Sequence, residues 1–198
     1  MSNSPTTSSD TSPGNLILGI DPALGTTGYG VVRDQGNRFE VIDAGIVRCN
    51  RKETLENRLL ELSQGITEIV EEFQPDCFAV EELYSHYERP TTAILMGHAR
   101  GVILLAASTA GVPVYSYAAT QIKKTLTGNG RASKSQMQFA VQHQLGLKQL
   151  PEPADVADAL AAAVTHCHHR LASENPALKP HVNTAYANLL KTHQAQHR

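Results

Sequence analysis

Two acidic residues in this sequence directly follow short apolar runs. Asp21 comes after Leu16–Ile20, and Glu81 comes after Cys77–Val80. Each run has the length and composition of a buried strand, and a buried strand seldom ends in an acid unless that acid faces a cleft, a helix cap or an ion. In open α/β sheets, ligands bind at the carboxyl ends of the strands. The two acids are therefore candidates for one site at a sheet edge.

A second pair of acids lies nearer the end of the chain. Asp155 and Asp158 are three residues apart in a segment that predicts a helix, so their side chains share one helix face. Small residues surround them, which leaves room for the helix to lie close against a sheet. The alanines of this segment are Ala154, Ala157, Ala159, Ala161, Ala162 and Ala163.

Taken one at a time, these acids have ordinary structural explanations. Asp21 is suited to begin a turn, Asp155 is suited to the first turn of a helix, and Glu81 is suited to pair with a base. Together, four carboxylates in a water-poor cleft would repel one another strongly without a cation. Their oxygens suit Mg²⁺ or Mn²⁺, and two such ions about 3.5–4 Å apart form the clamp that catalyses in-line phosphoryl displacement.

The charge of the chain is unevenly distributed. Its 198 residues hold 17 Lys and Arg against 19 Asp and Glu, and this net charge of −2 would by itself argue against a nucleic-acid partner. Residues 89–151, however, are +7 with no acid among them, which leaves the rest of the chain at −9. The pattern indicates either chance unevenness over a buried middle or a basic face for a polyanion beside an acidic site. The bases are Arg89, Arg100, Lys123, Lys124, Arg131, Lys134 and Lys148.

Hydrophobic periodicity predicts the elements that must position these residues. Three short strands with Gly-containing turns predict an antiparallel meander, and apolar residues then repeat at helical spacing from Leu55 to Phe73, before Pro75. Helices and strands alternate after that, so the chain predicts a mixed sheet with helices packed on its faces. The strands are expected over 16–20, 28–32, 39–47, 77–80 and 113–117, and the helices over 55–73, 91–110, 118–126, 133–145 and 155–169.

One domain between two tails is the expected organisation. Residues 1–15 are rich in Ser, Thr and Pro with no apolar signal region, so they are expected to form a disordered tail. Residues 16–171 are expected to form the domain, and residues 172–198 a polar C-terminal tail.

Cysteine usage favours a reduced compartment. Cys49, Cys77 and Cys167 are odd in number and show no CxxC spacing, which is typical of a cytoplasmic protein. No uninterrupted apolar run reaches the roughly 18–20 residues that span a bilayer.

Several motifs together resemble one known family. Gly19-Ile20-Asp21-Pro22 followed by Thr27-Gly28-Tyr29-Gly30, then Phe78-Ala79-Val80-Glu81, then Asp155–Ala161 leading to Thr165–His168, resemble the RuvC Holliday junction resolvases, in the family's order. The likeness covers roughly residues 16–169. It implies a ribonuclease-H-like α/β fold, with a mixed five-stranded sheet of a three-strand antiparallel meander plus two parallel strands and helices on both faces.

The resemblance also implies an activity. Family members are homodimeric, Mg²⁺-dependent endonucleases that resolve four-way DNA junctions by symmetric paired nicks during homologous recombination and DNA repair. They act with the RuvA–RuvB branch-migration complex. Carried over by position, the catalytic and metal-binding acids are Asp21, Glu81, Asp155 and Asp158. Two Mg²⁺ per subunit are expected, with Mn²⁺ able to substitute.

Four further residues are expected to bind DNA. Lys123 and Lys134 match family positions near the DNA and the active site, and Lys134 is expected to offset charge on the phosphate. Arg131 is expected to contact the DNA backbone. Tyr84 stands where the family has an aromatic residue that stacks on a base near the crossover.

The chain departs from the family pattern at three positions. Ala23 stands where the family usually has Gly after the first Asp-Pro, so that turn is expected to differ slightly. Glu82 adds an acid beside Glu81 where a neutral amide is expected, and strand alternation should point it away. Tyr84 keeps the aromatic surface of a phenylalanine and adds a hydroxyl.

The same motifs are also compatible with other functions. Gly19–Asp21 with Gly25–Thr27 also resembles the phosphate-loop opening of actin-like sugar kinases, but 198 residues leave no room for the second nucleotide loop of that class. A catalytically silent junction-binding homologue, or a nuclease of the same fold with another branched or single-stranded substrate, would share these motifs. The apolar helix at 89–107 is expected either to cover the sheet or to face a second subunit.

A zinc site near the end of the last helix is disfavoured. His166, Cys167, His168 and His169 are neighbours on a helix, so their side chains point in different directions, whereas a closed zinc site needs four converging ligands.

Overall fold

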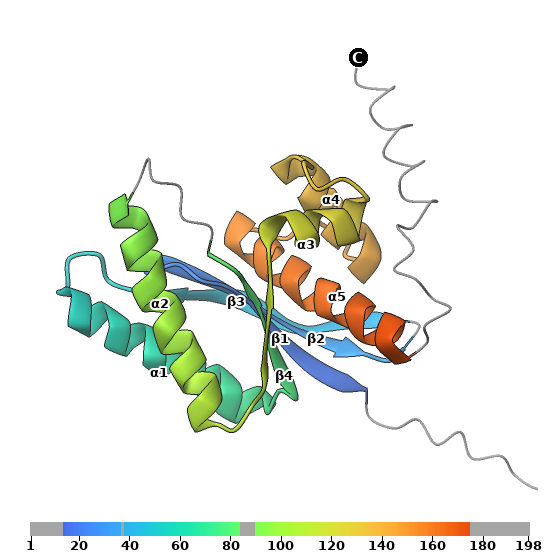
Figure 1. Ribbon diagram of the computed structural model, residues 1–198. Helices are drawn as coiled ribbons and strands as arrows, with labels where there is room; N and C mark the ends of the chain where they lie inside the picture. The colour runs from blue at the N-terminus through green and yellow to red at the C-terminus, as the bar shows by residue number, and fades with distance from the viewer. Residues whose placement is uncertain (1–13, 37, 84–89, 175–198) are drawn as a thin grey trace, which may run out of the picture.

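The computed structural model describes residues 14–36, 38–83 and 90–174. A five-stranded sheet lies between two layers of helices, and its strands are arranged in the order β3-β2-β1-β4-β5 (Figure 1). The strands are β1 Asn15–Asp21, β2 Thr26–Asp34, β3 Phe39–Arg48, β4 Cys77–Glu81 and β5 Val114–Tyr117.

The sheet is mixed, as the sequence predicted. β1, β2 and β3 pair antiparallel, whereas β4 runs parallel to β1 and β5 runs parallel to β4. Helices α1 and α2 cover one face, and α3, α4 and α5 cover the other (Figure 1). The meander, the two parallel strands and the helices on both faces are therefore confirmed. The helices are α1 Leu55–Phe73, α2 Pro90–Thr109, α3 Ala119–Thr127, α4 Lys134–Leu145 and α5 Ala154–Glu174.

Periodicity accounts for α1. Its buried residues include Leu62, Ile66 and Ile69, which recur at the spacing that keeps one helix face against the sheet. The helix ends at Phe73 because Gln74 adopts a left-handed backbone, with φ 50°, and its N–H donates to the carbonyl of Val70.

Helix α2 has one buried face and one exposed apolar face. Ala99, Ile103 and Ala107 are completely buried with the residues of α1, whereas Ile94 and Leu105 are 60% and 65% exposed. By length and composition, residues 91–109 would also suffice to span a membrane, a test that the core helices of soluble proteins pass as well. Only 17% of the 18-residue window that meets this test is buried within the described residues. The helix therefore covers the sheet and also presents apolar surface on its other side.

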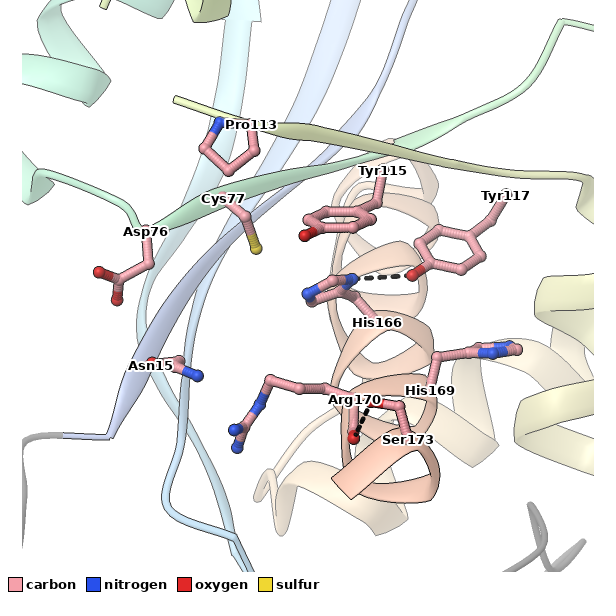
Figure 2. Close-up of a pocket in the computed structure, with 10 residues that line it drawn as sticks. All are labelled: Asn15, Asp76, Cys77, Pro113, Tyr115, Tyr117, His166, His169, Arg170 and Ser173. Carbon is pink, nitrogen blue, oxygen red and sulfur yellow. Dashed lines mark hydrogen bonds between the residues drawn. The ribbon is translucent and has the colours of Figure 1, made fainter. Parts of the chain in front are cut away.

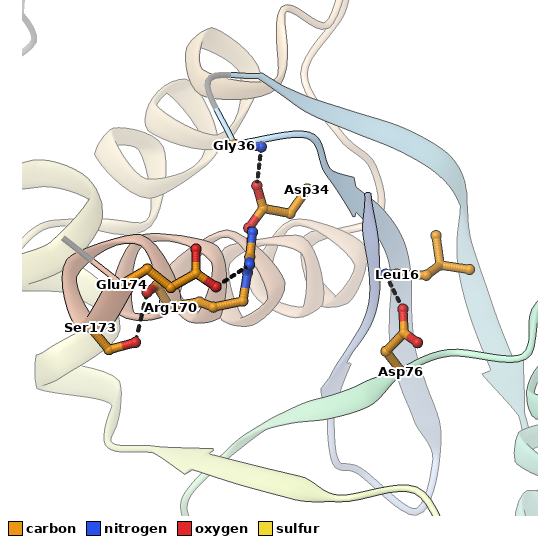
Figure 3. A network of polar contacts seen from close by, with 7 residues as sticks. All are labelled: Leu16, Asp34, Gly36, Asp76, Arg170, Ser173 and Glu174. Carbon is orange, nitrogen blue, oxygen red and sulfur yellow. Dashed lines mark hydrogen bonds and ion pairs between the residues drawn. The ribbon is translucent and has the colours of Figure 1, made fainter. Parts of the chain in front are cut away.

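Helix α5 packs across β1 and β2, where its alanines allow a close approach. The helix is fixed at its far end by Arg170, which donates from Nε and Nη2 to one carboxylate oxygen of Asp34 at 2.9 and 2.7 Å (Figure 3). The Asp34 side chain is completely buried, and its other oxygen accepts the N–H of Gly36 at 2.8 Å. This ion pair holds α5 beyond residue 169, where the sequence predicted the helix to end, and the helix continues to Glu174.

We predict that Arg170→Met lowers the free energy of unfolding by about 3 kcal/mol, because it leaves the buried Asp34 carboxylate without its partner. Urea unfolding followed by circular dichroism measures the change. Glu174→Gln is the matched control, since Glu174 pairs with the same arginine from an exposed position and is expected to cost less than about 0.5 kcal/mol. Equal losses in the two variants would contradict the importance of the buried contact.

Candidate active site

Asp21 and Glu81 are neighbours at one edge of the sheet. β1 and β4 pair in parallel with Ile20 opposite Val80, so the next position on each strand is one of the two acids. Neighbouring strands are about 4.8 Å apart. Gly19 and Ala79, two positions earlier, lie on the face covered by α5, and side chains alternate, so both acids face α5.

The first turns of α5 bring the second pair of acids to the same place. Asp21 is paired with Gly28 on β2, and the backbone of Asp155 lies directly against Gly28. Asp158 lies one helical turn further along the same helix face. Two strand ends and one helix start therefore meet where the sequence predicted a site.

Burial and the neighbouring acids both shift the pKa values at this edge of the sheet. Burial, followed by the charges of Glu81, Asp158 and Asp155 in that order, raises the pKa of Asp21 from 3.8 to about 7, and Lys134 opposes the rise. The pKa of Glu81 is raised by burial and then by Asp158. The pKa of Asp158 is also raised, by burial and by Asp155. Three of the acids therefore have raised pKa values, and Asp155 is among the charges that raise the pKa of Asp21 and of Asp158.

Two lysines counter this cluster. Lys123 on α3 and Lys134 on α4 both lower the pKa of Glu81 and of Asp158 against the effect of burial. Lys134 is the first residue of α4, directly after Ser133, which caps that helix. The N-terminus of a helix carries partial positive charge, so a lysine there does not stabilise the helix. Lys134 and the helix end together favour an anion bound beside the carboxylates.

Arg131 and Tyr84 are the other two DNA-binding candidates. Arg131 is exposed on the turn between α3 and α4, where its N–H donates to the side-chain oxygen of Asn129 at 3.0 Å. Tyr84 lies outside the described residues.

The turn after Asp21 accommodates Ala23 without strain. The Thr27 hydroxyl accepts the Ala23 N–H at 3.3 Å and donates to the Ala23 carbonyl, which closes the turn. Among the described residues, Gln74 is the one non-glycine residue with a positive φ, so Ala23 does not need the freedom of the family's glycine. Thr27 is completely buried, and its place in the Thr27–Gly30 motif does not by itself indicate this contact with Ala23.

Glu82 has a structural explanation of its own. Its N–H donates to the Tyr117 carbonyl at 2.9 Å, which continues the ladder between β4 and β5. The charges that shift the pKa of Glu81 come from Asp158, Lys123 and Lys134. The backbone of Glu82 therefore extends the sheet, whereas its side chain is exposed and is not among the charges that shift the pKa of Glu81.

The donor set fits a hard divalent cation. All four groups are carboxylates, which are the oxygen ligands that Mg²⁺ and Mn²⁺ prefer. Within residues 14–36, 38–83 and 90–174, no three His, Cys, Asp or Glu side chains stand close enough to hold one ion. Ionised carboxylates that lie near one another repel, and a bound cation offsets that repulsion. The fit therefore rests on donor chemistry and shared location.

The histidines of α5 have separate partners. His166 Nδ1 and the Tyr117 hydroxyl are 2.7 Å apart beside a cavity of about 320 Å³ formed by the last turns of α5 and the starts of β1 and β4 (Figure 2). His168 Nε2 lies 2.7 Å from Gln144 Oε1, and His169 Nε2 lies 3.1 Å from the side-chain nitrogen of Gln121. Three rings held by three different residues do not converge on one ion.

Comparison with known proteins agrees with the geometry. The family model described as crossover junction endodeoxyribonuclease RuvC matches residues 17–166. A relative of that name from Rhodopirellula baltica is 55% identical over 162 residues, which cover 82% of this chain and 89% of the relative. Another from Desulforamulus reducens is 46% identical over 151 residues, which cover 76% of this chain and 92% of the relative.

Solved structures agree as well. RuvC of T. thermophilus, in complex with a Holliday junction substrate, matches with a TM-score of 0.75 and 34% identity over 80% of this chain and 96% of that one. The yeast mitochondrial Holliday junction resolvase is 15% identical with a TM-score of 0.57, which shows the fold alone. The ribonuclease-H-like fold is thereby confirmed, and the chain belongs to the RuvC family of crossover junction endodeoxyribonucleases.

Proposed function

We propose that this chain is a structure-specific endonuclease that resolves four-way DNA junctions by symmetric paired nicks, in homologous recombination and DNA repair. The observation that carries the proposal is that the ends of β1 and β4 and the first turns of α5 bring Asp21, Glu81, Asp155 and Asp158 to one edge of the sheet, where Lys123 and Lys134 act on the same carboxylates. The T. thermophilus relative, which is described with a Holliday junction substrate, supports the same substrate here.

The four carboxylates are the residues that would hold Mg²⁺, with two ions per subunit and Mn²⁺ as a substitute. When bound, such ions activate the attacking water and stabilise the leaving 3′-oxygen. Asp21 is paired with Gly28 on β2 and directly follows Ile20, which is paired with Val80 on β4, so it lies between the other acids at this edge of the sheet. Because burial and the neighbouring acids raise its pKa to about 7, the Asp21 carboxyl would release its proton on binding such an ion.

The basic residues bind and orient the substrate. Lys134 and Lys123 place positive charge next to the scissile phosphate, where they offset the charge that develops during hydrolysis. Arg131, exposed on the turn between α3 and α4, contacts the DNA backbone, so affinity falls as salt rises. Tyr84 is assigned to stacking on an unpaired base because of its family position.

Two symmetric cuts need two copies of the site. One carboxylate cluster cuts one strand, so paired nicks imply a homodimer with a twofold axis. The exposed apolar face of α2, which includes Ile94 and Leu105, is the surface that we assign to the second copy. The family resemblance supports cooperation with RuvA–RuvB. A cytoplasmic location is supported by the three free cysteines, all of which are buried.

Purified protein with Mg²⁺ is expected to make paired symmetric nicks in a synthetic mobile four-way junction. Asp21→Asn should abolish the nicks and leave junction binding intact, because it removes the central carboxylate and none of the basic residues. Denaturing gels measure cleavage, and a mobility shift in EDTA measures binding. Glu82→Gln, an exposed acid next to Glu81, is the control and should cut normally. Uncut junction with wild-type protein, or undiminished cutting by Asp21→Asn, would disprove the assignment.

Asp21→Asn should also stabilise the metal-free protein at alkaline pH. The folded state holds the Asp21 proton up to about pH 7, whereas the unfolded chain releases it near 3.8. The free energy of unfolding therefore falls as pH rises through that window, and the full penalty remains above it. In EDTA, the variant should gain about 4 kcal/mol at pH 8 and less than about 1 kcal/mol at pH 4. Urea unfolding at both pH values tests this, and a gain independent of pH would contradict it.

Leu105→Glu should convert the dimer to a monomer, because it places a charge in the proposed apolar interface. Sedimentation analysis measures the oligomeric state, and the junction assay should then show loss of paired nicks. Leu60→Glu is the matched control, since Leu60 is 56% exposed on α1. A dimer that survives Leu105→Glu, or dissociates equally with Leu60→Glu, would argue against α2 as the interface.

A further inference from the structure

Helix α5 and strand β2 run alongside each other and are joined at both ends. At the active-site end, the backbone of Asp155 rests on Gly28, and at the far end Arg170 binds Asp34. Gly28 and Asp34 are six strand residues apart, or about 20 Å, whereas Asp155 and Arg170 are fifteen helical residues apart, or about 22 Å. The two segments match in length, so the far contact fixes α5 along β2 and the near contact sets its height above the sheet.

The near contact exists only because residue 28 has no side chain. A Cβ atom at Gly28 would come closer than 3.0 Å to the carbonyl carbon and oxygen of Asp155 and would lie 3.0 Å from the N of Val156. All of these atoms are backbone, so no side-chain rotation relieves the contact. Gly19 repeats the arrangement one helical turn later, against the carbonyl of Ala159.

Gly28 is also the cross-strand partner of Asp21. One residue therefore touches the backbone of Asp155 on one side and is paired with the strand residue that carries the central carboxylate on the other. We propose that Gly28 is a positioning residue that sets the separation between the α5 carboxylates, Asp155 and Asp158, and the sheet carboxylates, Asp21 and Glu81. This inference rests on the proposed function, because it concerns the geometry of the same four acids.

A side chain at position 28 would act through the helix. A Cβ atom at position 28 would lie 2.0 Å from the Asp155 carbonyl oxygen, so the first turn of α5 must withdraw by more than about 1 Å to restore ordinary contact distances, and Asp155 and Asp158 move with it. Asp21 and Glu81 stay on the sheet. Misplacement of about 1 Å within a catalytic group is enough to lower rates about 100-fold.

Gly30 provides a matched control on the same strand and the same face. A Cβ atom there would meet the Leu160 side chain, at 2.5 Å from Cδ2 and 2.8 Å from Cγ, whereas the nearest backbone atom, Leu160 Cα, lies at an ordinary contact distance of 3.4 Å. Gly30→Ala therefore disturbs packing under α5 without pushing on the backbone of Asp155. A difference between Gly28→Ala and Gly30→Ala therefore reports on the position of the first turn of α5, and not on the packing beneath the helix.

The test compares wild type, Gly28→Ala, Gly30→Ala and Asp155→Asn. Binding of Mn²⁺ to the protein alone, followed by electron paramagnetic resonance of the free ion, should be weakened at least about tenfold in Gly28→Ala and changed less than about threefold in Gly30→Ala. The rate of junction cleavage at saturating Mg²⁺ should fall about 100-fold in Gly28→Ala but not in Gly30→Ala. Junction binding in EDTA should be equal in both, because the basic residues lie on α3, α4 and their connecting turn.

A rescue experiment separates positioning from general damage. Asp155→Glu lengthens the side chain by one methylene, so it should lower cleavage in the wild-type background and raise it in the Gly28→Ala background. A destabilised Gly28→Ala is assayed in a stabilising osmolyte, with folding verified by circular dichroism. Equal Mn²⁺ affinity and cleavage in the two glycine variants, no rescue by Asp155→Glu, or a Gly28→Ala chain that stays unfolded even in osmolyte would each overturn the proposal. A wild-type protein that does not cut the junction, or cutting that survives Asp155→Asn, would instead overturn the proposed function.

Discussion

The burial of four carboxylates beside one another is the constraint that the rest of this structure has to satisfy. Asp21, Glu81 and Asp158 all have raised pKa values, with burial as the largest cause and neighbouring acids next. Such a cluster costs stability in the metal-free protein, so the surrounding structure has to hold the acids where they would not stay by themselves. The two lysines offset only part of that cost.

Packing of the sheet and of α5 keeps the four acids in place. β1 pairs with strands on both sides and is apolar on both faces, so Asp21 follows a run in which Ile17, Leu18 and Ile20 are completely buried. Helix α5 contributes the other acids from a segment of small buried residues, and its far end is fixed by a buried ion pair. The acids therefore stand at the margins of well-packed elements, where the packing of those elements resists their separation.

Much of this arrangement could be predicted from the sequence, for identifiable reasons. The spacing of Leu62, Ile66 and Ile69 is local information and gave α1 its bounds, and the acids after two apolar runs predicted that Asp21 and Glu81 would share an edge. Contacts between distant residues carry no local signal. The Arg170–Asp34 pair joins residues 136 positions apart, and so α5 extends further than its alanine-rich pattern indicated. The glycines of the Thr27–Gly30 motif were visible, but the helix that lies against them was not.

The matched lengths of β2 and α5 restrict how this domain can change during evolution. Surface loops usually tolerate insertions, but one residue inserted in α5 between Asp155 and Arg170 would rotate the two carboxylates by about 100° relative to the far anchor. An insertion in β2 between Gly28 and Asp34 would exchange the faces of the strand beyond it. Length variation among relatives is therefore expected to be confined to segments outside this pair of elements, whose residue counts are fixed together even where their sequences differ.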